Sequence, residues 1–399
     1  MVMAMTAADH VLRRTSLFEE HRRLGGRMIE FAGWELPVWY TGVAAEHAAV
    51  RTAAGLFDIG HMGVLEITGP EAAGFLEYAT TARASAIAVG RCHYTFVLDE
   101  TGLPLDDIIL YRMGAERFLA VVNAANAERV RGWLSGLLTA GAELRDLSGP
   151  EAGVDRRRGI ALQGPASARV LAAALGAAGA AAPGLRWFEL TEIELNGTSA
   201  VLSRTGYTGE RVGFEILGHP DALPALWRRI LEIGGPEGVL PAGLGARDSL
   251  RIEAGLPLFG HELAGRHEIT PLGAGYARIV DLEHEFVGRE GLLAREAERR
   301  CEVVRFGLDD PGARAIRADD PVASKRGELA GWVTSCALAG ERQVGMAWLD
   351  RRVGREGAKL LIYPARQAER AVSPADLSAL ALGDRMPVHE TATVLPRFR

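Results

Sequence analysis

The sequence predicts an α+β protein with two ferredoxin-like α/β-sandwich units and a small C-terminal β-barrel. Two observations carry this prediction. One order of elements (strand, helix, two paired strands, a further strand and a helix) occurs twice between residues 64 and 233, and short apolar segments separated by turns dominate the last third. The 399 residues suffice for two to four domains, and 48% hydrophobic with 24% charged residues is typical of a globular protein.

Two helices are expected near the N-terminus. Ser16 and Glu19 have the spacing of a capping box, in which each side chain accepts a hydrogen bond from a free backbone N–H at the start of a helix. Apolar residues follow at helical spacing, and Gly25 supplies the stop. A second helix is expected over residues 44–54, ending in the same way at Gly55.

The two units then follow each other along the chain. In each, an apolar strand runs into a Gly-Pro pair that opens a helix, because proline is well tolerated at the first helical position. The first unit has strands at 64–67, 94–98, 107–111 and 118–122 and a helix at 125–138. The second has strands at 159–162, 191–195, 200–203 and 213–217, an Asn196-Gly197 hairpin turn and a helix at 223–233.

The C-terminal third begins with a charged helix over residues 290–299. Short β segments follow, which is typical of a small barrel or sandwich. They are expected at 303–308, 329–333, 344–349, 360–363 and 388–395. Ser373-Pro374-Ala375-Asp376 is expected to cap one inserted helix.

Several classes of protein are excluded by composition and motif. The net charge of −6 argues against general nucleic-acid binding, and no apolar run is long enough for a membrane helix. No secretory signal is expected at the N-terminus. Three widely spaced cysteines form no disulfide framework, so we expect a cytoplasmic protein. Metal-binding, dinucleotide, phosphate-loop and nucleophile-elbow motifs are absent from the sequence, so no metal site is expected.

Asp106-Asp107 is the most prominent candidate for chemistry. The pair lies between a turn and an apolar strand, and strand alternation places Asp106 on one face and Asp107 on the face of Tyr111. One aspartate would then cap the turn while the other enters a pocket beside Tyr111. The alternative is two solvated aspartates at the end of a turn.

Two further residues stand out. Glu215 alternates out of an apolar strand, and its carboxylate matches adjacent N–H donors on a heterocycle such as a pterin; the alternative is an outward-facing glutamate. Arg247 lies near a helix N-terminus, where the dipole disfavours a cation. Arg247 is therefore expected either to bind a ligand carboxylate or to form an ion pair with Asp248 or Glu253.

Several segments together resemble the aminomethyltransferase, or T-protein, family of the glycine cleavage system. They occur in the family's order and cover most of residues 16–295. The segments are Ser16-Leu17-Phe18-Glu19-Glu20-His21, Phe31-Ala32-Gly33-Trp34-Glu35-Leu36-Pro37, Phe57-Asp58-Ile59-Gly60-His61-Met62, Asp106-Asp107, the glycine-rich loop 204–210 and residues 243–254.

The resemblance implies a three-domain cloverleaf around a central tetrahydrofolate site. The domains expected are 1–61 with 152–285, 62–151, and 286–399. Asp107 matches the family's functional aspartate, Glu215 its pterin-reading glutamate and Arg247 its folate-site arginine. Three further residues fall at positions expected to line the folate pocket: Tyr94, Tyr111 and Asn123.

The resemblance implies transfer of an aminomethyl group from a lipoyl-carrier protein to tetrahydrofolate, with release of ammonia and methylenetetrahydrofolate. Departures from the family pattern, among them Gly60 in place of a serine and Arg278 in place of a tryptophan, motivate an alternative. That alternative is a demethylase moving a methyl group from an N-, O- or S-methylated small molecule to tetrahydrofolate. A second alternative is a non-catalytic folate-binding protein.

Overall fold

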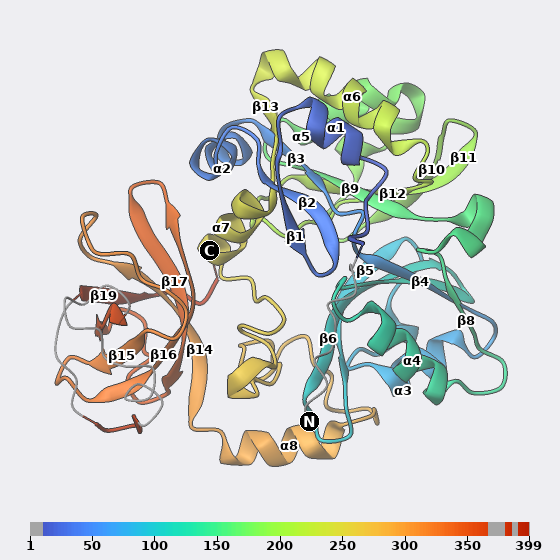
Figure 1. Cartoon of the computed structure of the whole chain (residues 1–399). Helices are drawn as coiled ribbons and strands as arrows, with labels where there is room; N and C mark the ends of the chain where they lie inside the picture. Colours follow the sequence, from blue (N-terminus) through green and yellow to red (C-terminus); the bar gives the residue numbers. More distant parts are fainter. Residues whose placement is uncertain (1–10, 366–379, 385–389, 399) are drawn as a thin grey trace, which may run out of the picture.

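A computed structural model describes residues 11–365, 380–384 and 390–398. Two large sheets with their helices, a two-stranded hairpin and a closed barrel lie around the central helix α7 (Leu244–Ala254) (Figure 1). This arrangement confirms the predicted α+β class with a C-terminal barrel. Within the described ranges, no helix combines the length and apolar character needed to cross a membrane.

The first unit forms a five-stranded antiparallel sheet in the order β5-β6-β7-β4-β8. Its helices α3 and α4 pack on one face through a core that includes Phe75, Leu110 and Val130. The elements are β4 (Gly63–Thr68), α3 (Ala72–Ala79), β5 (Arg91–Leu98), β6 (Pro104–Gly114), β7 (Arg117–Val122), α4 (Ala127–Leu137) and β8 (Glu143–Asp146), with a 3₁₀ turn at Ala84–Ala86.

The second unit repeats this topology with one strand added. Its sheet has the order β10-β11-β12-β9-β3-β13, so β3 from the N-terminal segment lies between β9 and β13. Asn196 and Gly197 both have positive φ, as the predicted hairpin turn requires. The elements are β9 (Arg158–Gln163), α5 (Ser167–Leu175), β10 (Leu190–Leu195), β11 (Thr198–Ser203), β12 (Gly213–Gly218), α6 (Leu223–Gly234) and β13 (Val239–Pro241), with 3₁₀ turns at Pro150–Asp155, Gly176–Gly179, Ala182–Gly184 and Gly235–Glu237.

Two predictions for the N-terminal segment are wrong. The segment contains α1 (Phe18–Arg23), β1 (Arg27–Phe31), β2 (Trp34–Trp39), α2 (Val43–Thr52) and β3 (Ala54–Asp58). Ser16 does not cap α1: the helix begins after Leu17 without a side-chain cap, and Thr15 Oγ1 accepts the Leu17 N–H instead. Gly55 does not end α2: the helix ends at Thr52, and Gly55 lies inside β3. A Cβ at Gly55 would approach the Val50 side chain to 2.5 Å, so a larger residue there would displace Val50.

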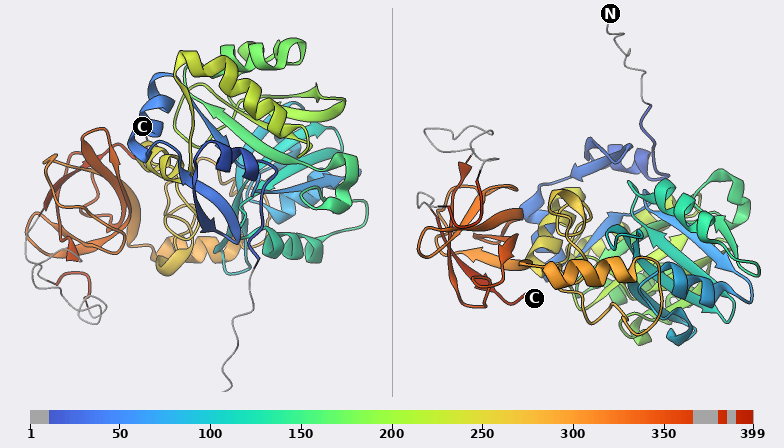
Figure 2. Two further views of the ribbon diagram at one scale, coloured as in Figure 1. Left: turned by 45° about the horizontal axis from the view of Figure 1, so that its top comes forward. Right: turned by 90° about the horizontal axis from the view of Figure 1, so that it is seen from below.

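The C-terminal part is a closed barrel in the order β14-β17-β16-β15-β18-β19. Helix α8 (Arg289–Glu298) leads into it, as predicted, and Figure 2 shows the barrel standing to one side of the two sheets. The expected helix at Ser373-Pro374-Ala375-Asp376 lies outside the described residues. The strands are β14 (Cys301–Leu308), β15 (Pro321–Ser324), β16 (Leu329–Ala339), β17 (Arg342–Asp350), β18 (Lys359–Ile362) and β19 (Glu390–Leu395).

Helix α7 connects the three parts. Its neighbours are α2 and β2 on one side and the barrel strands β16 and β17 on the other. After it, residues 255–288, with a 3₁₀ turn at Gly265–His267, contribute to a shared core that contains Phe96, Tyr276 and Met346. We propose three domains: a discontinuous domain of residues 1–61 with 152–285, a domain of residues 62–151, and a domain of residues 286–399. The discontinuous domain is supported by β3, which comes from the N-terminal segment but lies in the six-stranded sheet.

Candidate functional site

The Asp106-Asp107 pair lies in β6, and the two carboxylates point to opposite faces of the sheet. Asp106 is fully buried on the face that α3 and α4 cover, with Ile108 and Leu110. Asp107 is half-buried on the other face. Strand alternation therefore separates them as predicted. The alternative of two solvated aspartates is wrong.

Asp106 caps the turn before α4. Its Oδ2 accepts the backbone N–H of Asn123 at 2.8 Å. Its Oδ1 accepts the side-chain amides of Asn123 at 2.7 Å and Asn126 at 2.6 Å. Three N–H donors thus converge on one buried carboxylate, which is how a buried charge is retained.

Asp107 is held at both of its oxygens. Tyr94 Oη donates to Oδ2 at 2.8 Å, and Asn123 Nδ2 donates to Oδ1 at 3.0 Å. Burial raises the pKa of Asp107, and the hydrogen bond from Tyr94 and the charge of Arg247 counteract part of that increase. A partly buried carboxylate with a raised pKa is suited to exchange a proton with a ligand.

Glu215 lies in β12 of the second sheet and is only 7% exposed, so the outward-facing alternative is wrong. Thr205 Oγ1 donates to its Oε2 at 2.6 Å. The hydroxyl of Tyr111, which comes from β6 of the first sheet, donates to the same oxygen at 3.2 Å. The fully buried Tyr111 therefore holds the Glu215 carboxylate from the first sheet, and this hydrogen bond connects the two sheets.

Arg247 lies in the first turn of α7 without an ion-pair partner among the described residues. Asp248 pairs with Arg251, and Glu253 pairs with Arg51 and His47, so the predicted ion-pair alternative is wrong. Burial lowers the pKa of Arg247, while Tyr207, Glu215 and Asp107 counteract this effect. The guanidinium is therefore in the electrostatic range of both candidate carboxylates.

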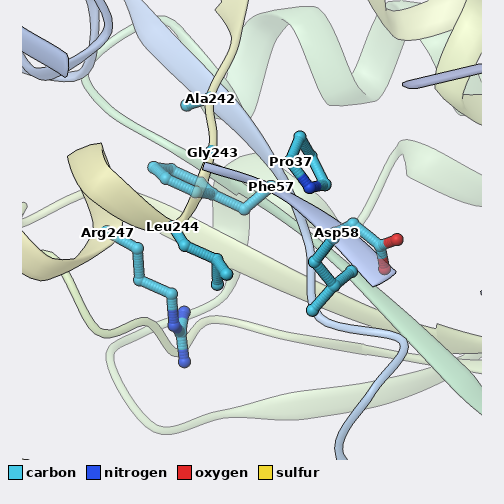
Figure 3. Close-up of a pocket in the computed structure, with 8 residues that line it drawn as sticks. Pro37, Phe57, Asp58, Ala242, Gly243, Leu244 and Arg247 are labelled. Atoms are coloured by element: carbon cyan, nitrogen blue, oxygen red, sulfur yellow. The ribbon is translucent and has the colours of Figure 1, made fainter. Parts of the chain in front are cut away.

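The surroundings of Arg247 are aromatic on one side and open on the other. Its guanidinium lies 4.8 Å from the centre of the Tyr207 ring, an attractive cation–π contact. Beside it lies a small pocket whose lining comes from β2, β3 and the start of α7, including Phe57, Asp58 and Leu244. Figure 3 shows the Arg247 side chain extending along this pocket, with Asp58 on its other side.

Sequence reasoning missed the polar network behind that pocket. Asp58 Oδ2 accepts a hydrogen bond from Thr15 Oγ1 at 2.6 Å and lies 2.7 Å from His21 Nε2. Tyr40 Oη lies 2.8 Å from the other ring nitrogen of His21. Burial by itself would raise the pKa of Asp58, but its bonds to His21 and Thr15 outweigh burial and lower it. Asp58 and His21 belong to two of the family-like segments, which was the available signal.

The site also contains two tyrosines that were not predicted. Tyr207 lies in the 204–210 loop, and its hydroxyl donates to the carbonyl of Pro257. Tyr276 packs its ring 5.5 Å from that of Tyr94. Burial raises the pKa of both Tyr207 and Tyr276, so both are neutral hydrogen-bonding groups at neutral pH.

The predicted site residues are thus brought together from both sheets and α7. Hydrogen bonds join Tyr94, Asn123 and Asp107 into one group and Tyr111 and Glu215 into another. Arg247 interacts by charge with both groups. Two carboxylates, a cation without an ion-pair partner among the described residues and aromatic rings fit a flat heterocycle with N–H donors and a negatively charged extension.

Comparisons with known proteins identify the family of the chain. Residues 17–284 match the family model described as the GCVT N-terminal domain. An aminomethyltransferase of Desulfitobacterium hafniense is 43% identical over 329 residues, covering 81% of this chain and 86% of the relative. One from Thermus thermophilus is 38% identical, covering 91% and 98% respectively.

A solved structure extends the likeness to the whole chain. The aminomethyltransferase T of the glycine cleavage system from Bartonella henselae superposes with a TM-score of 0.81 at 29% identity and covers 97% of both chains. The family model matches the two N-terminal units, and both the Thermus thermophilus relative and the solved structure also cover the barrel. The chain therefore belongs to the aminomethyltransferase family, that of the glycine cleavage T protein.

Proposed function

We propose that this aminomethyltransferase uses tetrahydrofolate as its one-carbon acceptor and takes an aminomethyl group from a lipoyl-carrier protein, releasing ammonia. The observation that carries the proposal is that Arg247, which has no ion-pair partner among the described residues, lies in the electrostatic range of both Asp107 and Glu215. Bound tetrahydrofolate would supply the nucleophilic nitrogen. A cytoplasmic location is also proposed, since all three cysteines are free thiols.

Each site residue has a distinct role in this proposal. Glu215, held by Thr205 and Tyr111, would accept adjacent N–H groups of the pterin. Arg247 would attract the carboxylates of the folate tail because no carboxylate in the described part of the chain pairs with it. Both groups bind and orient the ligand and need not exchange protons.

Asp107 is the proposed catalytic residue. Tyr94 and Asn123 fix the orientation of its carboxylate, and burial raises its pKa. In its ionised form such a group can accept a proton from the reacting nitrogen and stabilise positive charge that develops there, and in its protonated form it can return that proton. Proton exchange at Asp107 Oδ1 or Oδ2 is therefore the step assigned to this chain.

A turnover assay with two donor arms tests the proposal. Purified protein with tetrahydrofolate receives either an aminomethylated lipoyl-carrier protein or a panel of methylated amines, ethers and sulfonium compounds. Methylenetetrahydrofolate and ammonia from the first arm are expected. Methyltetrahydrofolate from the second arm, with the first silent, would instead establish the demethylase.

The variant Asp107→Asn separates catalysis from binding. Its turnover is expected to fall by about 10²- to 10⁴-fold, the usual contribution of a positioned acid–base group. Tetrahydrofolate affinity, measured by calorimetry, is expected to change only a few-fold. Asp155→Asn, at an exposed ion pair with Arg145, is the matched control. Undiminished turnover in Asp107→Asn would refute the catalytic assignment.

A further inference from the structure

The Asp106 carboxylate cannot touch a ligand, because it is fully buried beneath the sheet. Its hydrogen bonds are nevertheless unusually complete for a side chain with no exposed atom. All three come from amide N–H groups, two from Asn123 and one from Asn126. None comes from a hydroxyl, and this difference from Asp107 determines where a proton can reside.

Asn123 connects the two carboxylates. Its Nδ2 donates to Asp106 Oδ1 at 2.7 Å and to Asp107 Oδ1 at 3.0 Å. The same Nδ2 also donates to the backbone carbonyl of Asp107 at 3.2 Å, so the side-chain amide cannot rotate without breaking its bonds to both aspartates, while the backbone N–H of Asn123 separately anchors the residue to Asp106. The Asn123 carbonyl oxygen consequently points away from both carboxylates and accepts no hydrogen bond within the described part of the chain.

We propose that Asp106 is a positioning residue for the reaction: through Asn123 it fixes the Asp107 carboxylate, and its negative charge keeps a shared proton on Asp107. The inference rests on the proposed function, since it concerns the same site. Asp106 itself does not contact the substrate.

Hydrogen-bond chemistry places the proton. A protonated Asp106 would direct its O–H towards N–H donors, none of which can accept it. A protonated Asp107 can donate to the Tyr94 hydroxyl, which is able to reverse its role. Burial, followed by the charge of Asp107, raises the pKa of Asp106 to about 7. Burial also raises the pKa of Asp107, so the two neighbouring carboxylates hold one proton at a pH above the usual carboxyl range, and the hydrogen bonds around them place that proton on Asp107.

Few other charges act on the pair. On the α4 side, the Arg129 guanidinium contacts Asn126 Oδ1 and the carbonyl of Leu105. On the ligand side, Asp107 faces Tyr94 from β5 and the Arg247 cation from α7. The neutral hydroxyls of Tyr207 and Tyr276 lie in electrostatic range of Asp107 from the loops. None of these groups supplies Asp106 with a counter-ion.

Two variants are expected to shift the pH profile in opposite directions. Asp106→Asn removes the neighbouring negative charge, so the midpoint assigned to Asp107 should fall by about one pH unit or more. Asn126→Ala removes one N–H donor from Asp106, so the pair should take up its proton at higher pH. Asn126 makes no side-chain cap to α4, which favours survival of the helix.

The midpoint can be measured in two ways. The pH profile of kcat reports it during turnover. In the ligand-free protein, difference infrared spectroscopy of the protonated carboxyl C=O band reports it without substrate. In Asp106→Asn, kcat should also fall by about 10- to 100-fold through misplacement of Asp107. KM for tetrahydrofolate should stay within a few-fold of its original value.

Asp320→Asn controls for loss of a buried carboxylate. Asp320 is 3% exposed and accepts backbone N–H groups in the barrel, so this variant should lower the Tm without moving the midpoint. Unchanged midpoints in both Asp106→Asn and Asn126→Ala would overturn the proposal. If Asp106→Asn fails to fold, Asn126→Ala decides alone. Absence of turnover in the unaltered protein would refute the proposed function, while the infrared titration would still test the pair.

Discussion

His61 is a buried histidine whose environment makes stability depend on pH. It is 4% exposed, and its Nδ1 has no hydrogen-bond partner in the described ranges. Its ring packs edge-on against Phe31 at 5.7 Å. Burial, with the nearby charges of Arg247 and Arg158, lowers its pKa to about 4. The residue is therefore neutral in the folded protein throughout the physiological range.

The free energy of unfolding is expected to fall as the pH decreases from 6.5 to 4. In this window the unfolded chain binds a proton at His61 and the folded chain does not, so protonation favours unfolding. The difference amounts to about 3 kcal/mol. The variant His61→Leu should flatten this decline by a similar amount in urea titrations across the pH range. His267, whose pKa is also lowered to about 4, should retain its own contribution. An unchanged slope would contradict this account.

At the scale of elements, the turn between β5 and β6 packs directly against the backbone of helix α8. Gly102 has φ +81°, and a Cβ there would lie 2.2 Å from the backbone nitrogen of Leu292. Asp99 Oδ1 accepts the N–H groups of Thr101 and Leu103, which closes the turn. The close approach joins the first unit, which contributes Asp107, to the segment that leads into the barrel.

Gly102→Ala is expected to destabilise the protein by about 2–4 kcal/mol, because left-handed backbone strain adds to overpacking against α8. Gly136→Ala is the matched control. It lies inside α4, where an added Cβ meets no atom within 4 Å, so it should stabilise by about 0.5–1 kcal/mol. Chemical denaturation of both variants measures the contrast. Similar values for the two would show that the turn does not depend on this contact.

Many element boundaries could be predicted because their signals are local. Residues 64–67 and 108–111 are short, mostly apolar runs bounded by turn residues, and Asn196-Gly197 specifies its own turn. Strand β3 was missed because its first residues, Ala54 and Gly55, continue the alanine-rich helical segment and resemble a helix stop. The prediction that Ser16 caps the first helix was wrong because the hydroxyl of Thr15, one residue earlier, accepts the Leu17 N–H instead.

For the whole molecule, a buried ion pair joins α7 to the segment that precedes the barrel. Arg251 is 1% exposed and pairs with Glu262, which is fully buried, at 2.7 Å. The same guanidinium donates to Ser335 Oγ of β16 at 2.9 Å. Since α7 also contains Arg247, this contact links the position of the barrel to that of the candidate folate site.

Arg251→Met is expected to destabilise the protein by about 3–5 kcal/mol, because it leaves the Glu262 carboxylate buried without a counter-ion. The double variant with Glu262→Gln should recover part of this loss, since it removes the uncompensated charge. Thermal and urea denaturation of the two variants give the comparison. Equal destabilisation of single and double variants would mean that lost packing, not charge, dominates at this contact.

The sequence by itself determined the fold class, the repeated unit and the family, because periodicity, turn residues and ordered motifs are encoded over short stretches. It also indicated Asp107, Glu215 and Arg247 as site residues. Only the tertiary structure decided their partners. Tyr111 reaches Glu215 across 104 residues, and Asp248 and Glu253 pair elsewhere and leave Arg247 open. Such pairings depend on how sheets and helices pack in three dimensions, and no local pattern in the chain specifies that.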